Sequence, residues 1–176
     1  MVKMAKFFGY LLFFAFALAL FAPKDGVYFL FEKELSKYDV VISDEHLKEE
    51  LFSLNVDGLN VWAKGVESMN IESADLTLLL FYNTINLKNI ALADILKSYV
   101  PTKIDSLEAS YSIIDPLHVK AEAVGEFGEA RVSFDIVERS LTLKLTPSKE
   151  MLQGYKRTMR MLKKDEDGAY SYAKTF

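Results

Sequence analysis

The sequence predicts a mainly β protein, in which a single N-terminal transmembrane helix is followed by a curved antiparallel β-sheet. We expect about nine strands in a meander-like order, with one or two covering amphipathic helices. Three observations lead to this prediction. A charge-free apolar run occupies residues 7–22. Hydrophobic residues then recur at every second position, which is the period of a half-buried strand. One C-terminal segment changes to helical spacing.

The N-terminal run follows Lys3 and Lys6 and ends at Pro23. A helix of that length spans roughly 24 Å, which crosses a hydrocarbon core only if Tyr10 and the lysines reach the interface. The positive charge before the run predicts a cytoplasmic N-terminus and a body on the far side of the membrane. Residues 1–23 are therefore interpreted as a membrane anchor. The side chains expected to contact the membrane are Phe7, Tyr10, Leu11, Phe13, Phe16 and Leu20.

Two other interpretations of this run stay open. Alanines at positions 15, 17 and 19 offer small residues at signal-peptidase spacing, so residues 1–23 can also be a cleaved signal peptide. In both cases the body leaves the cytoplasm. A buried core helix of a cytosolic protein is the third interpretation.

Residues 24–37 are expected to form a short amphipathic linker helix, and residues 38–176 a single β-rich domain. No low-complexity linker and no repeat of about 20 to 50 residues divides this domain. Turn signals separate its apolar segments, among them Asp57-Gly58, Lys64-Gly65 and Asp115-Pro116. Gly125 and Gly128 are read as hairpin glycines. The strand segments are 38–42, 52–56, 59–63, 69–82, 85–90, 107–113, 117–123, 130–136 and 141–145.

The segment 147–164 is predicted to be an amphipathic helix. Thr146 can cap it, Pro147 suits its first position, and apolar residues from Met151 to Leu162 fall at helical spacing. Its basic face would carry Lys156, Arg157, Arg160 and Lys163. This face could contact a membrane surface or an acidic partner, or it could be a solvated face of a helix that covers the sheet. A short last strand with Tyr170 and Tyr172 should follow.

Composition and motifs predict a protein without enzymatic activity. The chain has a net charge of −4 and no cysteine, which argues against nucleic acid as a partner and against thiol chemistry. It contains no G-x-S-x-G, phosphate-binding loop or G-x-G-x-x-G pattern. His46 and Glu49 would share a face if helical, but no second histidine is near, so we expect no metal and no cofactor. A small hydrolase with a pair of acids brought together by folding is a remote alternative.

Two features of the body suggest contacts with a partner or a lipid. The segment Leu78–Tyr82 is apolar on both faces, so one face needs a cover, such as the helix 147–164, a partner protein or an acyl chain. Trp62 points away from its apolar neighbours Val61 and Ala63. The candidate contact residues are therefore Trp62, Leu80 and Tyr82.

The order of the elements resembles a family of envelope proteins. An anchor, a short helix and the stretches LFSLNVDGLNV (51–61), ADL (74–76) and INLKNI (85–90) are similar to the inner-membrane N component of type II secretion systems and to the N-terminal region of AsmA-like proteins. The segments 147–149 and 167–172 are similar to the carboxyl end of short N-family members. This resemblance implies a bacterial inner-membrane protein with a periplasmic, curved sheet. Its implied role is protein contacts in secretion or envelope assembly, with lipid binding or transfer as the alternative.

Overall fold

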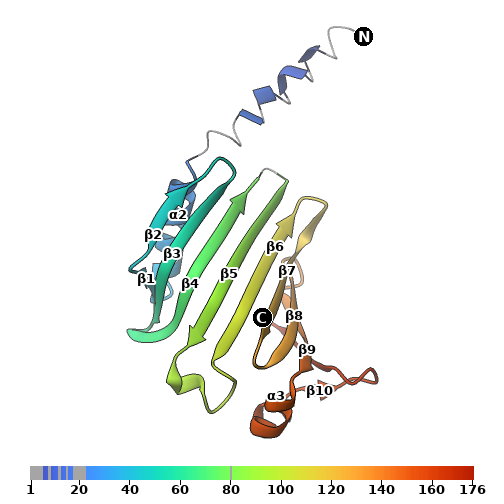
Figure 1. The fold of residues 1–176 in the computed structure, drawn as a ribbon. Helices are drawn as coiled ribbons and strands as arrows, with labels where there is room; N and C mark the ends of the chain where they lie inside the picture. Colours follow the sequence, from blue (N-terminus) through green and yellow to red (C-terminus); the bar gives the residue numbers. More distant parts are fainter. Residues whose placement is uncertain (1–5, 8, 12, 15, 18–22, 80) are drawn as a thin grey trace.

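In a computed structural model, which describes residues 6–7, 9–11, 13–14, 16–17, 23–79 and 81–176, one antiparallel sheet dominates the chain. Within these residues the sheet has eleven strands in the order β1-β3-β4-β5-β6-β7-β8-β9-β11-β10, and β2 also pairs with β3 (Figure 1). Consecutive long strands are neighbours, which is a meander. The strands are β1 Val40–Ser43, β2 His46–Glu49, β3 Ser53–Ala63, β4 Val66–Leu78, β5 Tyr82–Leu92, β6 Lys103–Ser112, β7 Asp115–Gly125, β8 Gly128–Asp135, β9 Ser140–Pro147, β10 Lys163–Lys164 and β11 Tyr170–Thr175.

The predicted antiparallel sheet is confirmed, but its strands differ from the prediction at three places. β2 occupies a segment for which no strand was predicted, and β10 lies in the predicted helix. Asp57-Gly58 is not a turn, because β3 runs through it and pairs with β4 on both sides. Gly58 instead takes a left-handed backbone conformation inside the strand, with φ +72°. A glycine followed by alternating residues fits both a turn between two strands and an irregular position inside one strand, so the local sequence does not distinguish the two.

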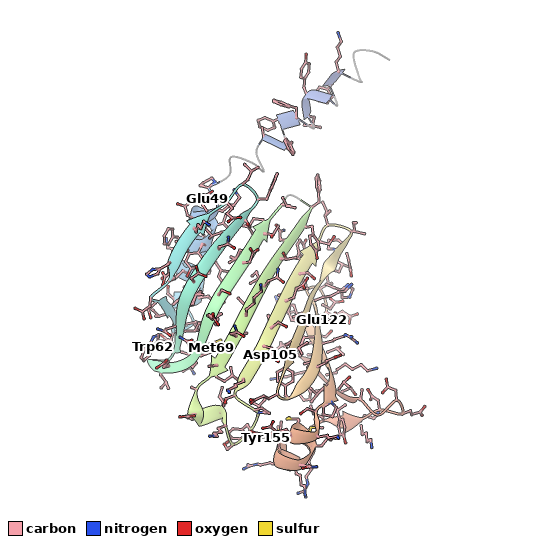
Figure 2. All side chains as sticks on the ribbon, in the orientation of Figure 1. Glu49, Trp62, Met69, Asp105, Glu122 and Tyr155 are labelled. Carbon is pink, nitrogen blue, oxygen red and sulfur yellow. The ribbon has the colours of Figure 1, made fainter. Side chains whose placement is uncertain are left out.

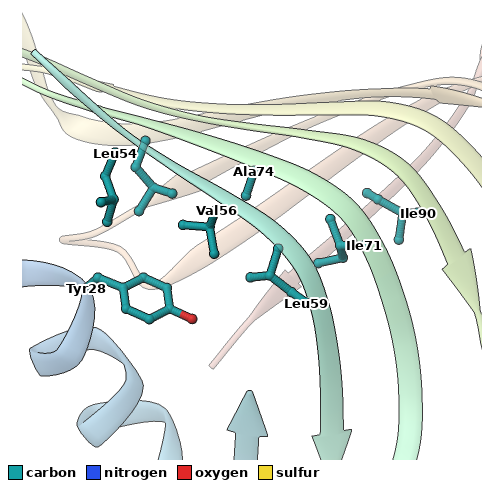
Figure 3. Packing of buried hydrophobic residues seen from close by; sticks show 8 residues of the cluster. Tyr28, Leu54, Val56, Leu59, Ile71, Ala74 and Ile90 are labelled. Atoms are coloured by element: carbon teal, nitrogen blue, oxygen red, sulfur yellow. The ribbon is translucent and has the colours of Figure 1, made fainter. Parts of the chain in front are cut away.

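A row of irregular positions crosses the sheet and bends it. Pairing skips Gly58 opposite Glu72, and Asn89 has φ +50° opposite the same Glu72. The register of β6 also shifts at Asp105. In each strand two consecutive residues face outward here, so the apolar residues on either side are three positions apart. Irregular positions of this kind increase local bending, and the strands curve where they pass Leu59, Ile71 and Ile90 (Figure 3).

The first core cluster lies between the sheet and α2 (Lys24–Ser36). Tyr28 of α2 packs against the strand residues that form this cluster, and Leu54 and Val56 are completely buried (Figure 3). The backbone N–H and the ammonium of the buried Lys24 donate to a Glu49 carboxylate oxygen, at 3.3 and 3.4 Å, and so hold the start of α2 against the end of β2. The expected linker helix is therefore a cover of the sheet. It is not cleanly amphipathic, since Phe29, Leu30 and Phe31 are exposed.

The predicted helix 147–164 is wrong as a single element. Pro147 ends β9, Ser148 caps α3 (Lys149–Gly154) by accepting from the Met151 N–H, and α4 covers only Lys156–Met159. The break at Tyr155 follows Gly154, whose missing side chain disfavours a helix interior. Met151 and Met159 still pack inward, in a second cluster with Phe127 and Leu145. A 3-10 turn, Asp94–Leu96, lies between β5 and β6.

The N-terminal segment leaves the sheet at the end where Glu49 lies, and Trp62 lies near the other end (Figure 2). Residues 6–7, 9–11, 13–14 and 16–17 are helical and extend beyond this end (Figure 1). Among the described residues, no helix combines the length and the hydropathy needed to cross a membrane.

Candidate functional site

The two faces of the sheet differ sharply in chemistry. Cross-strand pairing places one continuous apolar row from Leu54 through Leu76, Ile85, Ala109 and Ala121 to Val132, Leu143 and Tyr172 on the same face. The outward face carries mostly charged, amide and hydroxyl side chains. α2 covers the β1–β3 part of the apolar face, and the second core cluster covers it near Leu145. The middle strands of the apolar face lie between these two covers.

An apolar groove opens where α2 meets the middle strands. It has a volume of about 180 Å³, more than the roughly 150 Å³ of an apolar cavity that accommodates benzene. Strands β4 to β7 supply one wall and α2 supplies the other. Its lining residues are Val27, Tyr28, Phe31, Leu76, Leu78, Asn83, Thr84, Ile85, Ala109, Ser110, Tyr111 and Val119.

Tyr28 lines this apolar groove, and its hydroxyl is buried beneath the surface. Its side chain is almost fully buried, and its hydroxyl is, in the described part of the chain, the one buried side-chain polar atom without a hydrogen-bond partner. Burial raises the pKa of the Tyr28 phenol well above its ordinary value, and the carboxylates of Glu45 and Glu32 raise it further. The hydroxyl therefore stays protonated and is able to donate. Leaving it unpaired costs about 1–3 kcal/mol.

Small side chains extend the groove along the open part of the apolar face. Ala109 pairs with Ala121 across β6 and β7, and Ala123 pairs with Ala130 across β7 and β8. All four alanines are half-buried. We call these four residues the alanine trough. Ala109 lines the groove, whereas Ala123 and Ala130 pack against the second core cluster, so the trough joins the two.

The candidate contact residues from the sequence do not come together. Trp62 is 37% exposed on the polar face, where its indole N–H donates to the Ser43 hydroxyl at 3.3 Å. Tyr82 is exposed at the start of β5, while Leu80 lies outside the described residues. Leu78 lines the groove, so the cover expected over the run Leu78–Tyr82 is α2 and not the helix 147–164.

The residues of the predicted basic helix face are also dispersed, and the expected anchor residues lie partly outside the described residues. Lys156 and Arg157 lie on α4, Arg160 follows it and Lys163 lies on β10, all exposed, so the predicted basic helix face is wrong. Leu20 lies outside the described residues. The remaining expected anchor residues, Phe7, Tyr10, Leu11, Phe13 and Phe16, are helical and exposed.

The two histidines lie outside the apolar groove. His46 and Glu49 are three residues apart on a strand, so they point to opposite faces. His118 lies 2.6 Å from an Asp115 carboxylate oxygen and 3.4 Å from one of Asp135. The hydrogen bonds from Lys120 and His118 lower the pKa of Asp115 below its ordinary value. This cluster lies on the polar face, and no group of three metal-binding side chains occurs in the residues described.

Sequence reasoning missed Tyr28 and the alanine trough as parts of one site. The signal for the trough was present, because alanines replace larger residues at adjacent inward positions of three successive strands. The groove itself depends on the curvature of the sheet and on the position of α2. The alternation of apolar and polar residues in the sequence predicts neither of them. No protein-family model, no curated protein and no solved structure matches this chain.

Proposed function

We propose that this chain is a membrane-tethered protein whose apolar groove binds an acyl chain of a lipid. The observation that carries the proposal is the apolar groove between α2 and the middle strands, which reaches the alanine trough at Ala109. A soluble domain rarely exposes a continuous apolar face unless a ligand, a partner or a membrane covers it. An apolar groove suits a hydrocarbon chain, for which each buried methylene contributes about 0.8 kcal/mol.

The polar groups at the groove suit the carbonyl end of such a chain. Asn83 lines the groove beside Leu78 and Tyr111, and its side-chain amide N–H is able to donate a hydrogen bond to an ester or carboxyl oxygen. The proposed ligand therefore has one long apolar part and one oxygen-bearing end, as phospholipids and fatty acids have.

The proposed location is a bacterial inner membrane, with the sheet on the periplasmic side. The apolar N-terminal run, the lysines before it and the resemblance to AsmA-like proteins support this location. The resemblance also agrees with lipid handling. Protein contacts in secretion or envelope assembly stay a prediction from the sequence, since Trp62 lies outside the groove.

Filling the groove should remove the ligand. In Ala109→Phe, a phenyl ring would occupy the space between α2 and β6, and loss of about two methylene contacts would weaken binding at least about tenfold. Native mass spectrometry of the full chain, released from its membrane, should show one lipid-sized adduct on the unchanged protein and little on this variant.

The matched control is Ala173→Phe, which adds the same ring on β11, at an exposed position outside the groove. We expect this variant to keep the adduct. Equal adducts on the two variants, or no adduct on the unchanged chain, would contradict acyl-chain binding in this groove.

A further inference from the structure

The connections at one end of the sheet carry exposed apolar side chains. In a meander every second connection lies at the same end, so the β2–β3, β4–β5, β6–β7 and β8–β9 connections are neighbours there. Each of them presents at least one large apolar residue to solvent, and Ile114 is 92% exposed. We call these residues the apolar rim: Leu51, Phe81, Tyr82, Ile113, Ile114 and Val137.

The other end of the sheet has a different composition. Its exposed apolar residues include Tyr38, Val66, Ile95 and Tyr99, and charged residues such as Asp39, Lys64 and Lys97 lie among them. Phe127, in the β7–β8 turn, is buried. Single exposed apolar residues are normal on a protein surface, whereas apolar tips on four adjacent connections are not.

The apolar rim lies at the end from which the N-terminal segment extends. Lys24 is held to Glu49 at the end of β2, so the chain before Pro23 leaves beside the β2–β3 connection. The helical residues between 6 and 17 extend beyond this end and not beyond the other (Figure 1). The described aromatic residues of this segment are exposed, as the rim residues are.

We propose that the apolar rim inserts into the headgroup–acyl boundary of the bilayer, so that the sheet stands on the membrane at this end. Side chains of this kind typically reach about 5–10 Å into the boundary. Several charges next to the rim have partners, since Asp115 is paired with Lys120 at 2.6 Å and Asp135 accepts two backbone N–H bonds of its own connection. Glu138 and Arg139 follow Val137 on the same connection, and the proposal places them at the level of the headgroups. This docking does not depend on what the groove binds.

Docking at the rim also orients the groove. Leu78 and Asn83 stand on either side of the β4–β5 connection, and Tyr111, the next-to-last residue of β6, lies two residues before Ile113. The groove is therefore at the rim half of the sheet. Its mouth would face the acyl region of the bilayer and not the aqueous phase.

Single-cysteine labelling tests this proposal in the full-length chain, which has no cysteine of its own. Ile114→Cys and Val137→Cys place an environment-sensitive fluorophore on two rim connections, and Ile95→Cys places it at the other end. Val137 lies on the connection farthest along the sheet from β2, so proximity to the N-terminal segment alone does not bring it to the membrane. The emission of Trp62 reports whether each variant is folded.

The labelled proteins are reconstituted in vesicles of phosphatidylethanolamine and phosphatidylglycerol, with and without a spin-labelled phospholipid. We expect the quencher to lower the fluorescence at 114 and 137 at least about twofold and to leave the signal at 95 nearly unchanged. Equal quenching at all three positions, or no quenching at 114 and 137, would overturn the proposal. A blue-shifted but unquenched signal would also overturn it, because another copy of the chain would then cover the rim.

The groove variant separates this result from the proposed function. Ala109→Phe combined with either rim label should show the same quenching, because the rim does not include the groove. Loss of the lipid adduct with unchanged quenching would support both proposals. Quenching that disappears with Ala109→Phe would contradict an independent docking surface.

Discussion

Replacing Leu54 by alanine should lower the free energy of unfolding by about 2–5 kcal/mol. Leu54 is fully buried between Tyr28 of α2 and its cross-strand neighbour Leu76, so its removal leaves a cavity in the first core cluster. The same contacts hold α2 over the sheet. Urea unfolding followed by the emission of Trp62, the single tryptophan of the chain, measures the change.

The control for this variant is Leu152→Ala on α3. Leu152 is exposed, so the same chemical change should cost less than about 1 kcal/mol. A similar loss of stability in both variants would show that α2 does not pack on β3 and β4, and the groove would then lose its second wall.

Replacing Gly128 by alanine should destabilise the protein by about 2–6 kcal/mol, through two separate effects. Gly128 starts β8 with φ +109°, a conformation that residues with a side chain avoid. An added Cβ would also overlap the carbonyl oxygen of Thr146 and lie 2.7 Å from the backbone nitrogen of Ser148. Both atoms belong to backbone, which cannot move aside without breaking the pairing of β8 with β9.

The variant Gly65→Ala separates the cost of the left-handed backbone conformation from the cost of the steric overlap. Gly65 has φ +75° in the β3–β4 turn, but nothing lies near the position of its Cβ, so only the conformational cost of about 1–2 kcal/mol should remain. Thermal unfolding of the two variants side by side gives the comparison. If Gly128→Ala costs no more than Gly65→Ala, the close approach of β8 and β9 is not as described.

Much of the sheet could be predicted from the sequence because its register is fixed by alternation. Strands such as β7 and β8 read as clean apolar–polar repeats, joined by Gly125 and Gly128, and these hairpin glycines are found where they were expected. The end of β9 and the last strand were also placed closely. One buried face gives a period of two, and turn residues mark where each strand stops.

Features that depend on distant parts of the chain could not be predicted in this way. In the local sequence, Gly58 resembles a turn glycine. Only the strand pairing shows that the alternation of inward and outward residues also shifts at its neighbours Glu72 and Asn89. The phase shift was visible in each strand as apolar residues three apart, but only their alignment across four strands shows that the sheet bends. The groove requires this bend and the placement of Tyr28 on α2, which no local pattern encodes.

The C-terminal helix illustrates the opposite error. Helical spacing of Met151, Tyr155 and Met159 is real, and the two methionines are buried as expected. A prediction based on spacing alone, however, gives too little weight to Gly154, which disfavours a helix interior. It also places Pro147 at the first helical position, although Pro147 ends β9. Pro147 suits both the end of a strand and the start of a helix. Its pairing with β8 decides for the strand, and that pairing is a tertiary contact.

The most direct test of acyl-chain binding is photo-crosslinking in cells from a benzophenone amino acid in place of Tyr111. This side chain lines the groove and is 37% exposed, so the substitution should be tolerated. Mass spectrometry then identifies whatever is attached. We predict lipid adducts, which Ala109→Phe reduces. Adducts only with other proteins, or only within the chain, would contradict the account of this groove as a lipid site.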